Sequence, residues 1–265
     1  MKKILLCFMV VFSVLMSTCA ANVSIDGEIF SGGKLIGSVT YVPLRAFCDE
    51  VSDCDINWDA NKREATVNAG EVSLSAKISD MYIESKGRYL YSGNENILIN
   101  GTTYVPVRSI AKVFGAKVEW DANTRTAIIR TNSAEFESAD EFYNGNDLYW
   151  LAKIISAESE GEPLLGKIAV GNVVLNRVEN PEYPDNIHDV IFDTKGGVQF
   201  TPVLNGTINN TPTDESIMAA KICLEDFKVT DRDVLFFLNP TISQSFWITD
   251  NREFVMTVGK HDFYA

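Results

Sequence analysis

Three glutamates within five positions, Glu158, Glu160 and Glu162, are the residues whose type and spacing first suggest chemistry. The residues before them repeat apolar side chains at helical steps, at Leu148, Leu151 and Ile155. Position 158 continues that stripe, so Glu158 is a carboxylate where a helix would turn an apolar side chain toward the core. Partial burial raises the pKa of a carboxyl and keeps it protonated near neutral pH, so that it can donate a proton to a leaving oxygen. Cleavage of a glycosidic bond requires such an acid.

The same spacing allows a purely structural carboxylate at Glu158, satisfied by nearby backbone groups or by an ion pair. Glu160 is expected on the opposite face of the helix, in solvent. Gly161 is expected to end this helix, as a C-terminal glycine does. Glu162 and Pro163 are expected to begin the next helix, with the carboxylate near its positive end. Gly161 and Glu162 would then support the site rather than react.

The elements around these glutamates are mainly helical. A second helix is predicted over 163–178, where Gly166 and Gly171 indicate close packing, because glycine otherwise weakens a helix. The remaining predicted elements are a helix over 215–227, a long loop or short hairpin over 193–214, and strands or extended segments over 233–240 and 254–264.

The first half of the chain contains a duplication. The stretch TYVPLRAFCDEVSDCDINWDANKREATV (40–67) matches TYVPVRSIAKVFGAKVEWDANTRTAII (103–129). Each copy predicts a strand that ends at proline, a short amphipathic helix, a strand that carries a tryptophan, a turn and a final strand. Trp58 and Trp120 are expected to pack rather than to bind a ligand. The predicted fold class is α+β in two domains, a duplicated strand–helix–strand–strand module and a mainly helical domain with a small β element.

The two copies resemble the repeats of the copper amine oxidase N-terminal-like domain family, over about residues 24–132. The resemblance implies an exported, non-catalytic module that associates with the cell wall, with a mere spacer as the alternative. It implies no copper chemistry here, because the only histidines are His188 and His261, both in the other half. Neither has a cysteine pair beside it, so no metal and no cofactor are expected.

The stretch LAKIISAESEGEPLLGKIAVGNVVLNRV, together with the closing GKHDFY, resembles the cell wall hydrolase family of spore cortex-lytic enzymes, over roughly residues 147–265. The resemblance implies a lysozyme-like domain that cleaves the glycan strands of peptidoglycan between N-acetylmuramic acid and N-acetylglucosamine, usually as a lytic transglycosylase. It places the catalytic acid at Glu158, the first glutamate of an E-x-x-G-E motif. Spore cortex and vegetative wall are both open as substrates.

Sugar-binding residues are expected among the amide, hydroxyl and aromatic side chains of the second half. The predicted substrate-binding residues are Gln199, Thr201, Trp247 and Tyr264. His261 is predicted to be structural support that orients a group beside the site.

Two alternative functions stay open. A lytic transglycosylase needs one carboxylate, whereas a hydrolytic muramidase normally needs a second. Asp185, Asp189 and Asp193 are available for that second role, but none lies in a motif that places it. The other alternative is a non-catalytic wall-binding or structural protein that keeps the fold.

The chain begins in the manner of an exported protein. Lys2 and Lys3 precede a short apolar run and several small residues, which predicts a signal peptide over 1–21. An uncleaved anchor and a lipid attachment at Cys19 are the alternatives. The predicted domains are then 22–132 and 147–265, joined by a linker at 133–146, in a protein secreted to the cell wall or spore envelope.

The net charge of −13 is concentrated in residues 136–265, which carry 9 basic and 21 acidic side chains. Binding of nucleic acid through phosphate contacts requires clustered lysine and arginine, so nucleic acid is excluded as a partner. The charge provides no attraction to an anionic membrane either, and no membrane association is expected after signal cleavage. The expected partner is the peptidoglycan glycan strand.

Outside the signal segment the chain has three cysteines, Cys48, Cys54 and Cys223. Cys48 and Cys54 both occur where the first copy of the duplication departs from the second. An exported protein meets oxidising surroundings, so a Cys48–Cys54 disulfide is predicted.

Overall fold

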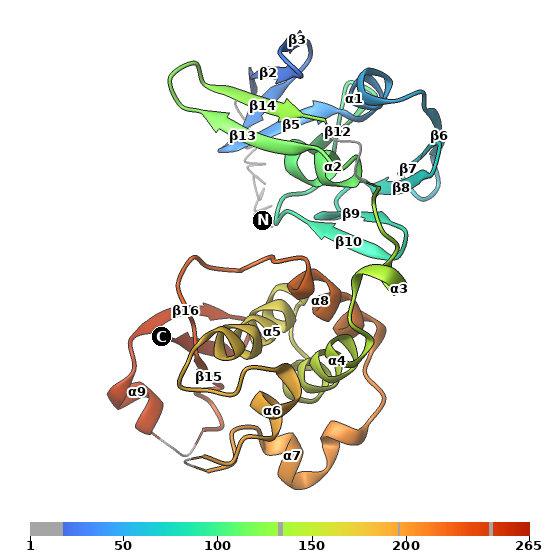
Figure 1. Cartoon of the computed structure of the whole chain (residues 1–265). Helices are drawn as coiled ribbons and strands as arrows, with labels where there is room; N and C mark the ends of the chain where they lie inside the picture. The colour runs from blue at the N-terminus through green and yellow to red at the C-terminus, as the bar shows by residue number, and fades with distance from the viewer. Residues whose placement is uncertain (1–17, 132–134, 196, 244–245) are drawn as a thin grey trace, which may run out of the picture.

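The computed structural model describes residues 18–131, 135–195, 197–243 and 246–265, in a β-rich first half and a helical second half (Figure 1). Residues 1–17, most of the predicted signal peptide, lie outside the described residues. The end of that segment forms β1 (Thr18–Ala20), which pairs with β4 (Lys34–Ile36). Across the described ranges, no helix is long and apolar enough to cross a bilayer.

Both copies of the duplication have the predicted order of elements. The first copy consists of β5 (Val39–Pro43), α1 (Leu44–Val51), β6 (Asp55–Asp59) and β7 (Glu64–Ala69). The second consists of β12 (Thr102–Pro106), α2 (Val107–Val113), β13 (Lys117–Asp121) and β14 (Thr126–Arg130). Each helix begins directly after the proline that ends its strand, since proline cannot donate to a continuing ladder.

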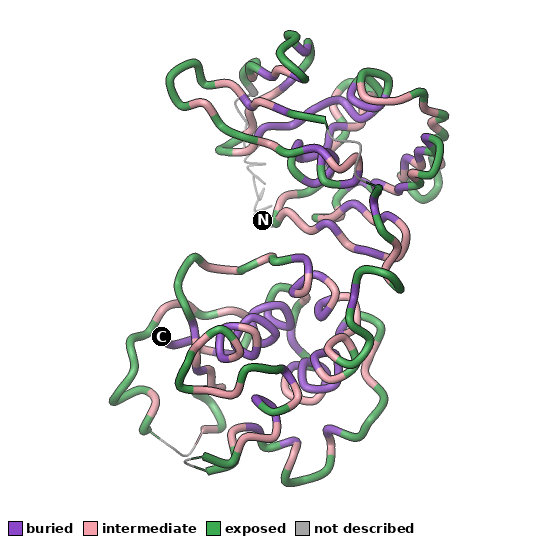
Figure 2. The backbone as a smooth tube through the Cα atoms, viewed as in Figure 1, coloured by how far each residue is buried: buried purple, intermediate pink, exposed green. Residues whose placement is uncertain are grey.

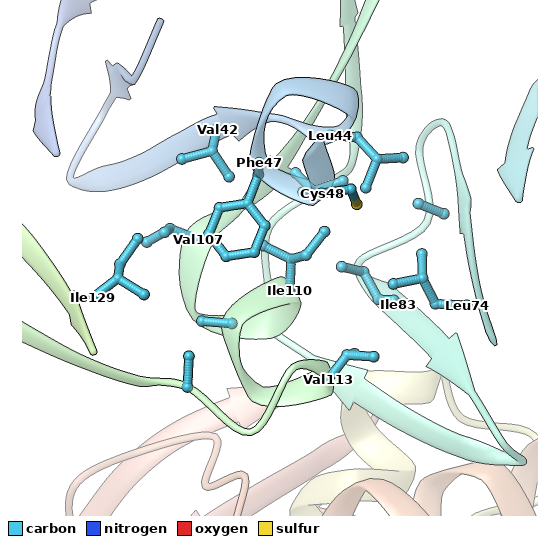
Figure 3. Packing of buried hydrophobic residues seen from close by; sticks show 14 of the residues in the cluster. Val42, Leu44, Phe47, Cys48, Leu74, Ile83, Val107, Ile110, Val113 and Ile129 are labelled. Atoms are coloured by element: carbon cyan, nitrogen blue, oxygen red, sulfur yellow. The ribbon is translucent and has the colours of Figure 1, made fainter. Parts of the chain in front are cut away.

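The two copies meet along their first strands. β5 and β12 pair antiparallel, with Val42 opposite Val105, and these two residues are equivalent positions of the duplication. This pairing places the following helices over one core, where Phe47 and Ile110 are both fully buried (Figure 3). The duplication therefore forms one domain rather than two.

The other strands of the first half complete three sheets. The sheet orders are β1-β4-β5-β12-β11, then β10-β9-β8-β7-β6, then β13-β14-β2-β3. Their remaining members are β2 (Asn22–Ile25), β3 (Glu28–Phe30), β8 (Val72–Lys77), β9 (Tyr82–Ser85), β10 (Arg88–Tyr91) and β11 (Ile97–Ile99).

The expectation that Trp58 and Trp120 pack is only partly right. Each lies opposite a buried alanine across its hairpin, Ala65 for Trp58 and Ala127 for Trp120. Cross-strand neighbours project to the same face, so each indole lies over its alanine. The two tryptophans nevertheless remain 41% and 48% exposed, so packing alone does not explain them.

The structure contains Cys48 and Cys54 as free thiols, so the predicted disulfide is not formed in it. Cys48 lies on α1 and is fully buried in the core of the first domain. Burial raises the pKa of the Cys48 thiol, and the neighbouring thiol of Cys54, which donates to the backbone oxygen of Ser52, raises it further. The pair is therefore adjacent but not cross-linked.

Most of the predicted linker is packed rather than open. Within 133–146, the described part contains α3 (Ala139–Phe142), whose start is capped reciprocally by Ser138 and Glu141. Phe136 and Tyr143 flank this helix and are each only 7% exposed. The segment lacks sequence periodicity because it is stabilised by aromatic contacts with both domains and not by a long helix.

The second half has the predicted mainly helical α+β composition. Its helices are α4 (Gly145–Ser159), α5 (Leu164–Glu179), α6 (Ile187–Phe192), α7 (Thr201–Asn205), the 3-10 turn Thr207–Asn209, α8 (Asp214–Leu224) and α9 (Trp247–Asn251). A small sheet has the order β15-β17-β16, from β15 (Phe236–Leu238), β16 (Phe254–Val258) and β17 (His261–Tyr264). Buried residues are concentrated in α4 and α5 (Figure 2).

The helices α4, α5 and α8 pack closely, as the glycines of the second helix predict. A Cβ atom on Gly171 of α5 would lie 2.6 Å from Cys223 Sγ of α8 and 2.8 Å from Ile155 Cδ1 of α4. Only glycine therefore fits where the three helices meet. This packing fixes the last turn of α4, which carries Glu158.

Candidate active site

Glu158 lies in the last turn of α4, one helical step beyond the fully buried Ile154 and Ile155, and is itself partly buried. Burial raises the pKa of its carboxyl to about 7, and the positive charge of Arg177 opposes that rise. Among the residues that the structure describes, no group hydrogen-bonds or ion-pairs with this carboxyl. The alternative of a purely structural Glu158, held by a hydrogen bond or an ion pair to a nearby group, therefore lacks support among the described residues.

Arg177 of α5 is the charged neighbour of Glu158, and it was missed by reasoning from the sequence. The residue is only 4% exposed, and its Nε donates a hydrogen bond of 2.8 Å to the backbone oxygen of Leu235. Its Nη1 is buried and has no hydrogen-bond partner in the described chain. Burial lowers the pKa of the guanidinium, while the charges of Glu158 and Asp193 oppose that effect. The sequence did contain an indication of this site. Arg177 is a charged residue within the apolar run of α5, just as Glu158 is a charged residue within the apolar stripe of α4.

Aromatic rings from three separate segments surround the Arg177 guanidinium. The ring centroids of Tyr183, Phe200 and Phe236 lie 5.2, 5.1 and 5.5 Å from its carbon. Contacts of this kind stabilise a cation that is withdrawn from water. Arg177 therefore gathers the loop after α5, the start of α7 and strand β15 around Glu158.

Gln199 and Thr201, two of the residues predicted to bind substrate, flank Phe200. Gln199 Nε2 donates hydrogen bonds to the backbone oxygens of Lys195 (3.2 Å) and Gly197 (3.0 Å), so its amide braces the preceding loop. Thr201 begins α7 and is exposed. Phe200 links both positions to Arg177, and this contact places them on the side of the domain that carries Glu158.

Trp247 and Tyr264, the two aromatic residues predicted to bind substrate, have different surroundings. Trp247 is 52% exposed, and its ring centroid lies 6.0 Å from that of Phe236, which also contacts Arg177. Tyr264 is only 5% exposed and packs edge-on against Phe254. The Arg252 guanidinium lies over one face of the Trp247 ring, 5.2 Å from its centroid, so only the other face is open to a ligand next to the Arg177 cluster. Tyr264 offers little surface to a ligand.

Glu162 is buried and contacts the β16–β17 turn rather than the start of α5. Its carboxylate accepts a hydrogen bond of 2.8 Å from the backbone N–H of Lys260. Gly259, at φ 60°, permits this contact, because a Cβ atom there would collide with the carboxylate. Pro163 is the N-cap of α5, which begins one residue later than expected.

The turn after Glu158 is held by a buried lysine. Lys167, 2% exposed, donates hydrogen bonds from Nζ to the backbone oxygens of Glu160 (2.9 Å) and Glu162 (2.6 Å). The first bond satisfies the carbonyl of the C-cap of α4, and the second satisfies a carbonyl of the turn between α4 and α5. Gly161 lies in this turn without a positive φ, and α4 already ends at Ser159, so the lysine rather than a glycine cap sets the turn. Glu160 is exposed, as expected.

His261, selected as a supporting residue, lies buried on β17. Burial lowers the pKa of its imidazole, and the charges of Glu162 and Asp262 oppose that effect. Its Nδ1 is buried without a hydrogen-bond partner among the described residues, and its ring lies 5.3 Å from that of Phe237. His261 therefore contributes to the wall behind Glu162.

The three aspartates considered for a second carboxylate have different surroundings. Asp185 is exposed and accepts a hydrogen bond of 3.4 Å from Asn186 Nδ2. Asp189 is exposed and engaged with Asn186 and His188, which lower the pKa of its carboxyl. Asp193 is the aspartate whose charge acts on Arg177. Within the described part of the chain, no group of three or more histidine, cysteine or acidic side chains is placed to hold a metal ion.

Comparison with known proteins assigns a family to each half. Residues 161–264 match the family described as Cell Wall Hydrolase, and residues 33–129 match the Copper amine oxidase N-terminal domain. The first of these ranges begins just after Glu158, so the match itself does not include that residue.

Individual relatives agree with the match of the second half. A spore cortex-lytic enzyme from Halalkalibacterium halodurans is 35% identical over 121 residues, which are 46% of this chain and 35% of that protein. A spore cortex-lytic enzyme from Bacillus cereus is also 35% identical over 121 residues, which are 45% of its length. The chain thus spans less than half the length of these curated relatives.

Among solved structures, the catalytic domain of the germination-specific lytic transglycosylase SleB from Bacillus anthracis is 34% identical. The match covers 46% of this chain and 97% of that one, with a TM-score of 0.42. The resemblances seen in the sequence are confirmed at the level of family: the chain joins a copper amine oxidase N-terminal domain, over residues 33–129, to a cell wall hydrolase domain, over residues 161–264.

Proposed function

We propose that the chain cleaves the glycan strands of peptidoglycan between N-acetylmuramic acid and N-acetylglucosamine as a lytic transglycosylase, with Glu158 as its acid and base. The observation that carries the proposal is the state of the Glu158 carboxyl. It is partly buried, lacks a hydrogen-bond partner among the described groups and has its pKa raised to about 7. A carboxyl with that pKa exists in both protonation states near neutral pH, so it can give up a proton and take one back.

In the first step, protonated Glu158 donates its proton to the oxygen that bridges the two sugars. The bond between that oxygen and the anomeric carbon of the muramic residue breaks, and N-acetylglucosamine leaves with a new hydroxyl. Glu158 is then a carboxylate, and the guanidinium of Arg177 favours this charged form. Arg177 thus stabilises the state that follows proton transfer.

In the second step, the Glu158 carboxylate removes the proton from the 6-hydroxyl of the muramic residue. The oxygen of that hydroxyl bonds to the anomeric carbon and closes an intramolecular anhydro ring. One proton is given and one is taken back, and no water is consumed. A single carboxylate therefore completes the cycle, in contrast to the usual pair of a hydrolytic glycosidase.

The substrate and the location follow from the relatives. Two relatives are spore cortex-lytic enzymes by name, and the wall polymer lies outside the cell membrane. We therefore propose an exported protein that acts on peptidoglycan of the spore cortex or vegetative wall. In this proposal the copper amine oxidase N-terminal domain serves for wall association.

Digestion of purified peptidoglycan by the full chain, followed by mass spectrometry of the fragments, tests the proposal. Anhydro-muramic products, lighter by one water than hydrolytic ones, are expected. Glu158→Gln should reduce their release by a factor of about 10²–10⁴. Glu160→Gln, which changes an exposed carboxylate two residues away, is the matched control and should retain activity. Full activity of Glu158→Gln would remove Glu158 from its proposed role.

A hydrolytic muramidase is the second candidate, and the charge of Asp193, which raises the pKa of Arg177, favours Asp193 as its additional carboxylate. Reducing-end muramic acid among the products would indicate this route. Asp193→Asn should abolish hydrolysis but leave anhydro products if the transglycosylase route operates. Binding without any fragments would indicate the non-catalytic alternative.

A further inference from the structure

A cleft of about 740 Å³ lies where the two domains meet, away from the residues around Glu158. Its walls come from β5, β10, α2 and β13 of the first domain, with the residues just before β5 and just after β10, and from the segment 225–227 that follows α8. Neither Glu158 nor Arg177 lines it. The volume is within the range of about 300–1,000 Å³ that is usual for sites of small ligands.

A buried ionic cluster holds the two walls of this cleft together. The Glu225 carboxylate accepts hydrogen bonds from Arg88 Nε (2.6 Å), Arg88 Nη2 (2.9 Å) and the Tyr143 hydroxyl (2.9 Å). Lys112 Nζ lies 2.7 Å from the same carboxylate. The side chains of Arg88 and Glu225 are only 5% and 3% exposed. Because this network is buried and well paired, the cleft is formed before any ligand arrives.

Aromatic rings line the cleft from both sides. Trp120 of β13 is 48% exposed, although it is a large apolar side chain. Tyr91 of the first domain and Phe227 of the second also line the cleft and contact each other edge-to-face, with ring centroids 4.7 Å apart. The cleft thus offers the open face of an indole next to a fixed aromatic pair.

Polar groups alternate with these rings. Ser38, Ser92 and Asn94 line the cleft, and so does the cation Arg108. The Ser92 hydroxyl and the Asn94 amide N–H donate hydrogen bonds to backbone oxygens of their own loop, so the Ser38 hydroxyl and Asn94 Oδ1 are the groups that a ligand can use. Arg108 is exposed and has no ion-pair partner among the residues described. Asp226, which follows the C-cap of α8, also lines the cleft and has a φ of 65°, a left-handed conformation that aspartate adopts readily at a helix end.

We propose that this interdomain cleft binds a short stretch of peptidoglycan glycan strand, as a second glycan site separate from Glu158. The apolar face of a pyranose ring stacks on the Trp120 indole, while a sugar hydroxyl bonds to the Ser38 hydroxyl and an acetamido N–H donates to Asn94 Oδ1. Arg108 pairs with a carboxylate of the peptide that is attached to the muramic residue. The ligand class rests on the proposed function, whereas the site itself rests on the geometry of the cleft.

A second glycan site has a physical consequence for action on a polymer. The strand bound in the cleft keeps neighbouring strands at a high effective concentration near Glu158. The cleft therefore increases activity on insoluble peptidoglycan and leaves activity on short soluble fragments unchanged, because a short fragment cannot occupy both sites.

The duplication supplies a matched control for the test. Trp58 is the equivalent of Trp120 in the first copy, is 41% exposed, and does not line the cleft. Binding to purified peptidoglycan is measured by co-sedimentation of the full chain carrying Glu158→Gln, so that the polymer is not degraded. In that background Trp120→Ala should weaken binding about tenfold, as loss of an aromatic anchor does, and Trp58→Ala by less than about twofold.

Further variants and ligands define the chemistry of the site. Trp120→Tyr should restore most of the binding because it keeps a ring. Arg108→Gln should weaken binding to peptidoglycan but not to N-acetylglucosamine oligomers, which lack the carboxylates. Equal binding by Trp120→Ala, Trp58→Ala and their parent would overturn the proposal.

The same variants separate this inference from the proposed function. In the active background, Trp120→Ala should release fewer fragments from intact peptidoglycan and unchanged amounts from short soluble glycans. If no version of the chain releases fragments but Trp120→Ala still loses binding, the cleft stands and the catalytic proposal falls. If Trp120→Ala binds normally while fragments appear, the catalytic proposal stands and the cleft falls.

Discussion

Two opposing effects act on the pKa of the Glu158 carboxyl. Withdrawal from water disfavours its charged form, and the neighbouring guanidinium of Arg177 favours it. Burial is the larger effect, which leaves the pKa at about 7. A group that must act first as an acid and then as a base works best with a pKa near the pH of its surroundings.

Removal of the Arg177 charge tests this balance. Arg177→Met should raise the pKa of Glu158 above about 7, because the charge that favours the carboxylate is lost. Since protonated Glu158 begins the reaction, the alkaline limb of the pH profile of kcat/KM should move to higher pH. Arg232→Met is the control, because Arg232 lies in an exposed pair with Glu253 and should leave the limb in place. An unshifted limb in Arg177→Met would contradict the electrostatic coupling.

The raised pKa of Glu158 also predicts a pH-dependent stability. Its folded-state pKa of about 7 lies above the ordinary value of 4.5, so the charged form destabilises the fold as pH rises through 7. Glu158→Gln should therefore increase the free energy of unfolding by about 1–2 kcal/mol at pH 8. At pH 4 both side chains are neutral, and the difference should vanish. Denaturant unfolding at the two pH values measures it, and an equal difference at both would contradict the assignment.

At the scale of elements, the site depends on how closely three helices approach. Gly171 removes a side chain where α4, α5 and α8 meet, which brings the end of α4 against α5. Lys167 then fixes the turn between α4 and α5, and Glu162 ties this turn to the β16–β17 hairpin. Glu158 and Arg177 face each other because these contacts set the relation of their helices.

Gly171→Ala tests the close approach. The added methyl would lie within contact distance of Cys223 Sγ and Ile155 Cδ1, so overpacking should exceed the gain in helix propensity and destabilise the protein by about 1–2 kcal/mol. Gly161→Ala is the control, because nothing lies within 4 Å of the new methyl and its φ is not positive. Thermal unfolding compares the two, and a Gly171→Ala protein as stable as wild type would exclude tight packing at this point.

The adjacent thiols of α1 and its following loop give a redox prediction. Because the Cys48 and Cys54 thiols are close enough to perturb each other's pKa, oxidation of the folded protein should form the disulfide predicted from the sequence. Such a short loop should stabilise the fold by about 2 kcal/mol. Peptide mapping without reductant should find the linked pair, and Cys223, fully buried on α8, should remain a thiol. Alkylation of both Cys48 and Cys54 in oxidised protein would rule the bond out.

At the scale of the whole molecule, the two domains share a buried charge cluster and are not joined by a free tether. Burial by itself would raise the pKa of the Glu225 carboxyl. Hydrogen bonds from Arg88 and Lys112 outweigh that effect, so the pKa lies below its ordinary value. Its carboxylate is therefore charged inside the interface. Arg88 is in turn covered by Phe136 and Phe142 of the connecting segment, whose rings lie 4.2 and 3.4 Å from its guanidinium carbon.

Arg88→Met should weaken the interaction between the two domains and lower the free energy of unfolding. The substitution leaves a buried carboxylate without its bidentate partner, which should cost about 3 kcal/mol. Arg130→Met, which removes an exposed pair with Glu119, should cost at most about 1 kcal/mol. Unfolding followed by limited proteolysis near Ser138 reports on both stability and exposure of the connecting segment. Identical midpoints for the two variants would mean that the cluster does not couple the domains.

The features that depend on neighbouring residues could be predicted from the sequence. The duplication, its strand–helix–strand–strand order and the helices on either side of Gly161 follow from periodicity and from proline and glycine positions. The same periodicity marked Glu158 as a carboxylate on the core-facing side of its helix. The solvent exposure of Trp58 and Trp120 could not be predicted from the sequence, because strand periodicity does not indicate which other segments pack against a strand.

Tertiary structure alone decided which distant residues meet. Arg177 lies beside Glu158 because α4 and α5 pack around Gly171, and Arg88 reaches Glu225 across 137 residues of sequence. The cleft between the domains likewise exists only once that pair has formed. Local sequence sets the conformation of each segment because its contacts are short-range, whereas burial and charge pairing across the molecule depend on the packing of all segments together.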